Sequence, residues 1–282
     1  MTAPITLQDE QQDIPEGALS TKLILIAMPK CGLHALVSAV RPVAAVWIDA
    51  VWIGSFDGYG WKTSYVDNHL EQSIEKIQKQ PEGTFMRGHL APHPDIVQEM
   101  YDQGSTPLFI YRNLRDVAVS STYHIRTAGD EDGDGILHFN PQPFKDMDFE
   151  DALAEVIRGG HGMDSLVSRW HSFKGWMDIP WILKVKYEYL VEDFYSTAML
   201  MFRYIAGRAA LSKYGDDIKL VLNRDQADEV VSGMRHAFGQ KSESPTFRRG
   251  KPGGWRDDWN DRAEKAFRDT GAMEANWELG YE

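Results

Sequence analysis

Residues 23–32 read Leu-Ile-Leu-Ile-Ala-Met-Pro-Lys-Cys-Gly, an apolar run that ends in a Pro-Lys-Cys-Gly turn. A continuous apolar run of this length is typical of a parallel strand that is buried on both faces. A helical pattern at residues 34–40 follows the glycine. A strand that turns sharply into a helix leaves the first N–H groups of the helix without intrahelical partners, and these groups bind anions. We therefore predict a phosphate-binding turn at the end of this strand.

A second segment repeats this arrangement about eighty residues later. The apolar run 107–112 ends in Arg112-Asn113, and a helical pattern at 114–124 follows. Two such anion sites at neighbouring strand ends suggest a ligand with two separate phosphate-type groups, one at each end of a nucleoside.

Strands alternate with helices along the whole chain, which predicts a mostly parallel sheet. We expect an α/β fold: a single three-layer domain with a central, mostly parallel sheet, of the P-loop-like nucleotide-binding kind, over residues 21–282, preceded by a flexible N-terminal arm at 1–20. Residues 42–67 look irregular, and the Gly- and acid-rich stretch 127–148 looks like one long loop. The other predicted strands are 84–89 and 181–187, and the other predicted helices are 70–80, 94–102, 149–157, 163–176, 189–206, 226–236 and about 261–270.

Composition limits the classes of partner. The 282 residues carry a formal net charge of −12, which argues against nucleic-acid and anionic-membrane binding. There is one cysteine, Cys31, so no intramolecular disulfide can form. No stretch has the ~20 apolar residues of a membrane span, and residues 1–20 lack the apolar core of a signal peptide. We expect a cytoplasmic protein with no membrane partner.

Five blocks, taken together and in this order, resemble the sulfotransferases that use 3′-phosphoadenosine 5′-phosphosulfate (PAPS). No single block is specific, but the order matches the family from about residue 22 onward. The blocks are Pro29-Lys30-Cys31-Gly32, Arg87-Gly88-His89-Leu90, Arg112-Asn113-Leu114-Arg115-Asp116 with Ser120, Lys186-Tyr187-Glu188-Tyr189-Leu190, and Phe247-Arg248-Arg249-Gly250 with Trp255. The resemblance implies transfer of a sulfuryl group from PAPS, leaving PAP as the product, to a hydroxyl or amine of a small acceptor.

The resemblance also implies which residues bind the nucleotide. The turn Lys30, Cys31, Gly32, Leu33 and His34 corresponds to the loop that binds the 5′-phosphosulfate. The 3′-phosphate would be bound by Arg112, Ser120, Arg248, Arg249 and Gly250, because an arginine fork and a hydroxyl suit a phosphate. Tyr187 corresponds to a tyrosine that contacts adenine. Taken alone, Ser120 is an ordinary helix serine, Arg248 and Arg249 suit a solvated loop, and Tyr187 suits a core.

Three residues are implied in the chemistry. The acceptor must lose a proton while the leaving phosphate gains charge, so the site needs a base and a cation on opposite sides of sulfur. His89 is the candidate base, Lys30 the cation for the leaving phosphate, and Arg87 a further cation for a sulfonate oxygen. The alternatives are a strand-end histidine bonded to backbone and a solvated loop lysine. Arg115 is expected to lie outside the site, in a supporting position or at the surface.

The chain departs from the family at the first turn. Leu33 and His34 replace two threonines that bind the phosphosulfate, and Ala35 stands where a tryptophan often stacks on adenine. These changes leave open a non-catalytic PAP- or PAPS-binding relative. A kinase on a related fold is a weaker alternative, because the spacing of a Walker loop is missing.

Metal, acceptor and oligomeric state are less well defined. Asp130, Asp132 and Asp134 begin like a calcium loop, but Pro141 stands at the twelfth position, so we expect no metal. Aromatic residues between 47 and 61 suggest a flat or aromatic acceptor, although they suit a core equally well. The oligomeric state stays open.

Overall fold

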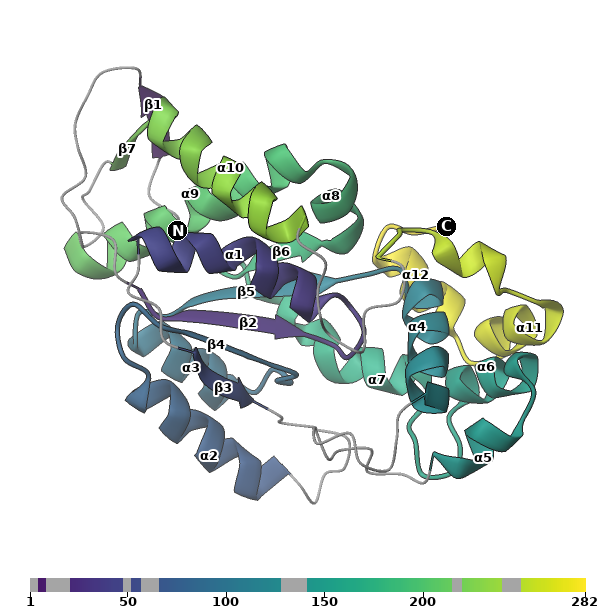
Figure 1. The fold of residues 1–282 in the computed structure, drawn as a ribbon. Helices are drawn as coiled ribbons and strands as arrows, with labels where there is room; N and C mark the ends of the chain where they lie inside the picture. The colour runs from purple at the N-terminus through teal and green to yellow at the C-terminus, as the bar shows by residue number, and fades with distance from the viewer. Residues whose placement is uncertain are drawn as a thin grey trace.

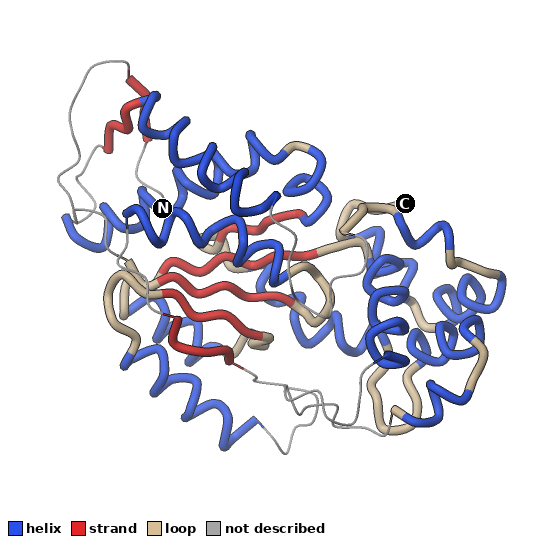
Figure 2. Tube along the Cα trace, viewed as in Figure 1, coloured by secondary structure: helices blue, strands red, loops and turns tan. Residues whose placement is uncertain are grey.

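A computed structural model describes residues 5–8, 21–47, 52–56, 66–127, 141–214, 220–239 and 250–282. Its centre is a five-stranded sheet in the order β3-β4-β2-β5-β6, in which every neighbouring pair is parallel (Figure 2). The strands are β2 (Leu23–Ala27), β3 (Trp52–Phe56), β4 (Phe85–Gly88), β5 (Thr106–Tyr111) and β6 (Leu183–Lys186). The predicted parallel sheet is confirmed.

Strand β2 lies in the middle of this sheet, and all five of its residues are buried. Its neighbours are β4 and β5, so that Ile26 is in register with Gly88 on one side and Phe109 on the other. A strand covered on both faces must be apolar throughout, which explains the unbroken run at residues 23–27.

Helices cover both faces of the sheet, and a further group of helices lies beyond the carboxyl ends of the strands. Figure 1 shows α1 and α10 over one face and α2 and α3 over the other, while α4, α5, α6, α11 and α12 form a group beyond the carboxyl ends of the strands. The helices are α1 (Leu33–Trp47), α2 (Val66–Lys79), α3 (Pro94–Asp102), α4 (Leu114–Thr127), α5 (Gln142–Asp146), α6 (Phe149–Arg158), α7 (Leu166–Phe173), α8 (Tyr187–Glu192), α9 (Phe194–Tyr214), α10 (Arg224–Gly239), α11 (Asp261–Asp269) and α12 (Ala272–Glu278), with 3₁₀ turns η1 (Lys174–Asp178) and η2 (Gly254–Asp257).

Several predicted elements need correction. The predicted helix 189–206 is two helices, α8 and α9, which Asp193 separates. A last helix, α12, was not predicted. The stretch 42–67 contains the end of α1 and strand β3, and the stretch 127–148 contains α5. Residues 128–140, with most of the calcium-like pattern, lie outside the described residues.

The first twenty residues include a strand that the sequence did not indicate. Strand β1 (Ile5–Gln8) pairs in parallel with β7 (Leu220–Asn223) in a separate two-stranded sheet (Figure 1). Within the predicted N-terminal arm, residues 5–8 are therefore extended and paired.

Candidate active site

Four functional segments begin where four adjacent parallel strands end. Along the order β4-β2-β5-β6, the residues just beyond the strand ends include His89, Lys30, Arg112 and Tyr187. Neighbouring strands lie about 4.8 Å apart, so these four segments span about 14 Å along one edge of the sheet. In open α/β sheets, ligands bind outside the carboxyl ends of the strands, at the point where the strand order reverses. Here that point is at β2, because β3 and β4 lie on one side of it and β5 and β6 on the other. The fold therefore places the candidate base, the candidate cations and the aromatic ring along one end of the sheet.

The turn after β2 is tight and depends on glycine. The N–H of Cys31 donates to Met28 O at 3.1 Å, and the N–H of Leu36 makes the first bond of α1, to Gly32 O at 3.0 Å. Gly32 has φ +102°, and a Cβ added there would lie 2.4 Å from Tyr187 Cδ2. The N–H groups of the first turn of α1 precede that first bond, so the turn has the geometry of an anion site.

Lys30 combines an unusual backbone with an unusual charge. Its φ is +70°, in the left-handed region that residues other than glycine rarely adopt. Burial, together with the nearby Arg112 guanidinium, lowers the pKa of its ammonium from 10.5 to about 8. Strain of this kind is concentrated at functional sites.

Cys31 takes part in the turn through its backbone N–H, and its thiol is buried. Its side chain is buried, and that burial raises the pKa of the thiol to about 12. A thiol with this pKa stays protonated and is a poor nucleophile near neutral pH.

His89 has a defined tautomer. Its Nδ1 lies 2.8 Å from Ala27 O, the carbonyl of the last residue of β2. A carbonyl oxygen only accepts, so Nδ1 carries the proton and Nε2 is the nitrogen that can receive one. The loop that follows is also held, because Trp176 Nε1 donates to Leu90 O at 2.7 Å. The backbone bond expected of a strand-end histidine is present, and it leaves the ring oriented as a base requires.

The structure brings Arg87 together with His34, one of the residues at which the chain departs from the family. Arg87 Nη1 lies 3.3 Å from His34 Nδ1. A guanidinium has no acceptor, so Nδ1 of His34 accepts this bond and the ring is neutral in this arrangement. The contact of Arg87 with His34 thus joins β4 to the first turn of α1.

Arg112, Tyr187 and Gly250 meet at the other end of the line. The Arg112 guanidinium carbon lies 4.3 Å from the centre of the Tyr187 ring, and Tyr187 Oη donates to Gly250 O at 3.0 Å. Arg112 Nε is buried with no hydrogen-bond partner in the described part of the chain, so this cation retains a donor for an anionic ligand. Tyr187 is 4 % exposed and is the first residue of α8, not the last of a strand. Arg248 and Arg249 lie outside the described residues.

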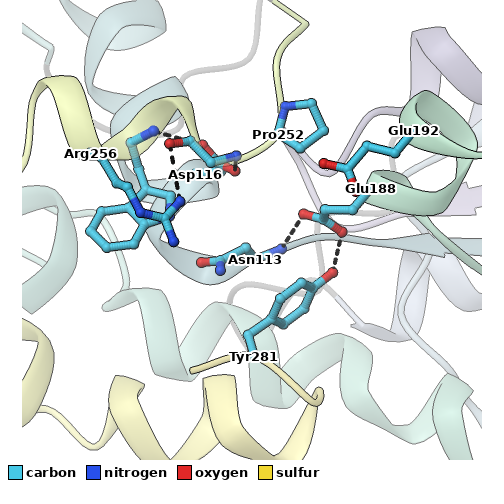
Figure 3. Close-up of a pocket in the computed structure, with 9 residues that line it drawn as sticks. Asn113, Asp116, Glu188, Glu192, Pro252, Arg256 and Tyr281 are labelled. Atoms are coloured by element: carbon cyan, nitrogen blue, oxygen red, sulfur yellow. Dashed lines mark hydrogen bonds between the residues drawn. The ribbon is translucent and has the colours of Figure 1, made fainter.

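The start of α4 is not the open anion site that the sequence predicted. The N–H of Asn113 donates to Glu188 Oε1 at 3.2 Å (Figure 3). The N–H of Leu114 donates to Asn276 Oδ1 at 2.8 Å, and that of Arg115 donates to Asn113 Oδ1 at 2.9 Å. Side chains of this chain therefore satisfy these three donors. A 3′-phosphate here would have to bind side chains such as those of Arg112 and Ser120, and Ser120 lies partly buried two turns along α4.

Asp116 ties the segment 250–255 to α4. Its buried carboxylate accepts from the N–H of Gly253 at 2.8 Å and from the N–H of Trp255 at 2.9 Å (Figure 3). Asp116 Oδ1 also lies 3.7 Å from Arg112 Nη2. The sequence analysis assigned no role to Asp116 or Glu188. The available signal was their charge within two of the blocks that resemble the sulfotransferases.

Arg115 is not at the surface. It is 6 % exposed, and its guanidinium lies over the rings of Trp255, Trp259 and Phe267. Burial in this aromatic setting lowers its pKa, and Glu264 opposes the shift. Arg115 therefore packs α4 against the C-terminal helices.

The described part of the chain has neither a metal-binding cluster nor a membrane-spanning helix. In it, no group of three or more His, Cys, Asp or Glu residues is arranged to hold a metal ion. No helix in the same ranges has the length and apolar composition needed to cross a membrane.

Comparison with known proteins defines the class. The sulfotransferase domain family matches residues 20–272, and the chain belongs to this family. Mouse sulfotransferase SULT7A1 complexed with PAP superposes with a TM-score of 0.56 at 14 % identity, over 88 % of this chain and 82 % of that one. Retinol dehydratase in complex with androsterone and inactive cofactor PAP gives a TM-score of 0.54 at 16 % identity, over 92 % of this chain and 82 % of that one. Retinol dehydratase in a complex with retinol and PAP gives a TM-score of 0.53 at 16 % identity, over 89 % of this chain and 81 % of that one. These likenesses establish a shared fold. A search of curated proteins returned no match.

Proposed function

We propose that this chain transfers the sulfuryl group of PAPS to a hydroxyl or amine of a small acceptor. The observation that carries the proposal is the line of His89, Lys30, Arg112 and Tyr187 at the carboxyl ends of four adjacent strands, in a chain of the sulfotransferase family. The 5′-phosphosulfate would bind at the turn after β2, and the 3′-phosphate near Arg112. The bound PAP named for the structural neighbours supports this choice of nucleotide.

In the proposed reaction, His89 accepts the hydroxyl proton at Nε2 while the acceptor oxygen forms its bond to sulfur. Lys30 donates to the bridging oxygen, which keeps the electron pair when its bond to sulfur breaks. Arg87, held beside His34 at 3.3 Å, lies two residues before His89 on β4 and would bind a sulfonate oxygen. A histidine base and a lysine cation on opposite sides of sulfur match the charges that develop.

The acceptor belongs at the His89 end of the line, because the nucleotide would occupy the other three strand ends. Retinol and androsterone in the complexes of the neighbours support a small hydroxylated molecule, and an aromatic acceptor is one version of this prediction. The cytoplasmic location stays a prediction that cell fractionation would test.

Labelled PAPS with a panel of phenols, alcohols and amines tests the proposal. We expect transfer to at least one acceptor, and we expect His89→Ala to lower turnover by about 10²–10⁴-fold, the usual contribution of a general base. PAP affinity should be nearly unchanged in this variant, because the base acts on the acceptor.

Two results would contradict this assignment. Wild-type turnover in His89→Ala on a verified acceptor would move the base to another residue. Tight PAP binding without transfer to any acceptor would favour the non-catalytic relative, for which the substitutions at Leu33, His34 and Ala35 are the specific reason.

A further inference from the structure

The start of α4 holds a carboxylate of this chain where the sequence predicts room for a ligand anion. Glu188 Oε1 accepts from the N–H of Asn113 at 3.2 Å, and Oε2 accepts from the hydroxyl of Tyr281 (Figure 3). A helix N-terminus stabilises an anion through its unpaired N–H groups and its dipole. We propose that Glu188 is a positioning residue for 3′-phosphate recognition, an inference that rests on the proposed function.

The contact fixes two functional segments against each other. Asn113 directly follows Arg112, and Glu188 directly follows Tyr187, so the Glu188 bond runs beside the contact of the Arg112 guanidinium with the Tyr187 ring at 4.3 Å. These two contacts hold the segment after β5 against the start of α8. A long arginine side chain loses much rotamer freedom when it binds a phosphate, so fixing its backbone and its stacking partner beforehand strengthens binding.

Tyr281 completes the arrangement from a distant part of the chain. Its ring packs edge-on against Tyr111 with centroids 6.5 Å apart, and Lys186 Nζ lies 4.0 Å from its centre. Burial raises the pKa of its hydroxyl, and the negative charge of Glu188 raises it further, so the group remains a donor. Both carboxylate oxygens of Glu188 therefore have a donor, which fixes the orientation of the side chain.

A competing role predicts the opposite sign. If the Glu188 charge acted only by repelling a nearby phosphate, its removal would strengthen PAP binding. If Glu188 positions Arg112 and Tyr187, its removal weakens PAP binding although an anion has been taken away. AMP lacks the 3′-phosphate, so it reports any effect on the rest of the nucleotide site.

Calorimetry with PAP and with AMP on purified wild-type and variant protein tests the proposal. For Glu188→Ala we expect PAP affinity to fall at least about tenfold, comparable to the loss of one charge-assisted hydrogen bond. We expect AMP affinity to fall by a smaller factor, because AMP keeps the adenine that Tyr187 would contact but has no 3′-phosphate for Arg112. Glu188→Gln should lose less PAP affinity than Glu188→Ala, because the amide oxygen of the glutamine can still accept from the Asn113 N–H. Glu192→Gln removes an exposed carboxylate from the same short helix and should match wild type.

Circular dichroism and the urea unfolding midpoint establish that each variant is folded, and Glu188→Gln, which keeps the side-chain shape, serves if Glu188→Ala does not fold. Unchanged or tighter PAP binding in a folded Glu188 variant overturns the inference, and so do equal losses for PAP and AMP, which indicate a merely structural residue. A wild-type protein that binds PAP and AMP equally overturns the proposed function itself, and the inference with it.

Discussion

We predict that the ammonium of Lys30 makes PAP binding sensitive to alkaline pH. Burial lowers its pKa from 10.5 to about 8, so the group loses its charge as pH rises through about 8. At this pKa the ammonium is about 90 % charged at pH 7 and about 10 % charged at pH 9. If only the charged form binds the 5′-phosphate of PAP, the apparent Kd rises about tenfold between these pH values. A lysine with an ordinary pKa would change the Kd by less than about 5 % over the same range.

Calorimetry with PAP at pH 7, 8 and 9 measures this directly. The phosphate groups of PAP, with second pKa values near 6, are largely ionised at pH 7 and contribute little above it. Repeating the titration at pH 9 in buffers of different ionisation enthalpy should show proton uptake on binding, because the bound anion restores the charge of Lys30. Lys30→Met should bind weakly and with a flat pH profile. An equally flat wild-type profile would refute the argument, since it would mean that Lys30 is charged throughout or does not touch the ligand.

Two further predictions concern the turn and the cations. Gly32→Ala should destabilise the fold by at least about 2 kcal/mol, because the residue has φ +102° and the new Cβ would lie 2.4 Å from Tyr187 Cδ2. Gly254→Ala, where a Cβ would meet nothing within 4 Å, should stay within about 0.5 kcal/mol of wild type in the same urea unfolding measurement, and similar losses for both variants would contradict the steric explanation. EDTA should leave turnover unchanged, because the proposed cations are all side chains, whereas strict magnesium dependence would favour the kinase alternative.

Local pattern was sufficient for most of the secondary structure. The bounds of α3 were predicted as observed, since Pro94 can begin a helix and the apolar positions repeat at helical spacing. Prediction failed where tertiary contacts decide. Strand β1 exists through its pairing with β7, more than two hundred residues away. The break between α8 and α9 falls within a continuous helical pattern, so periodicity could not locate it.

The sequence by itself determined the parallel sheet, the strand-to-helix turns and the residues at the strand ends, because apolar runs, glycines and charges are local signals. It placed His89, the pair Lys30 and Gly32, and Arg112 at three such ends. Only the tertiary structure decided which of their groups remain available to a ligand. The N–H groups at the start of α4 have the same local sequence signal as those at the start of α1, yet Glu188 and Asn276 satisfy them from 75 and 162 residues away. Likewise, the charge of Arg115 suggested a surface position, whereas three aromatic rings from the C-terminal segment enclose it. Satisfaction of a polar group depends on what folds against it, and no local pattern contains that information.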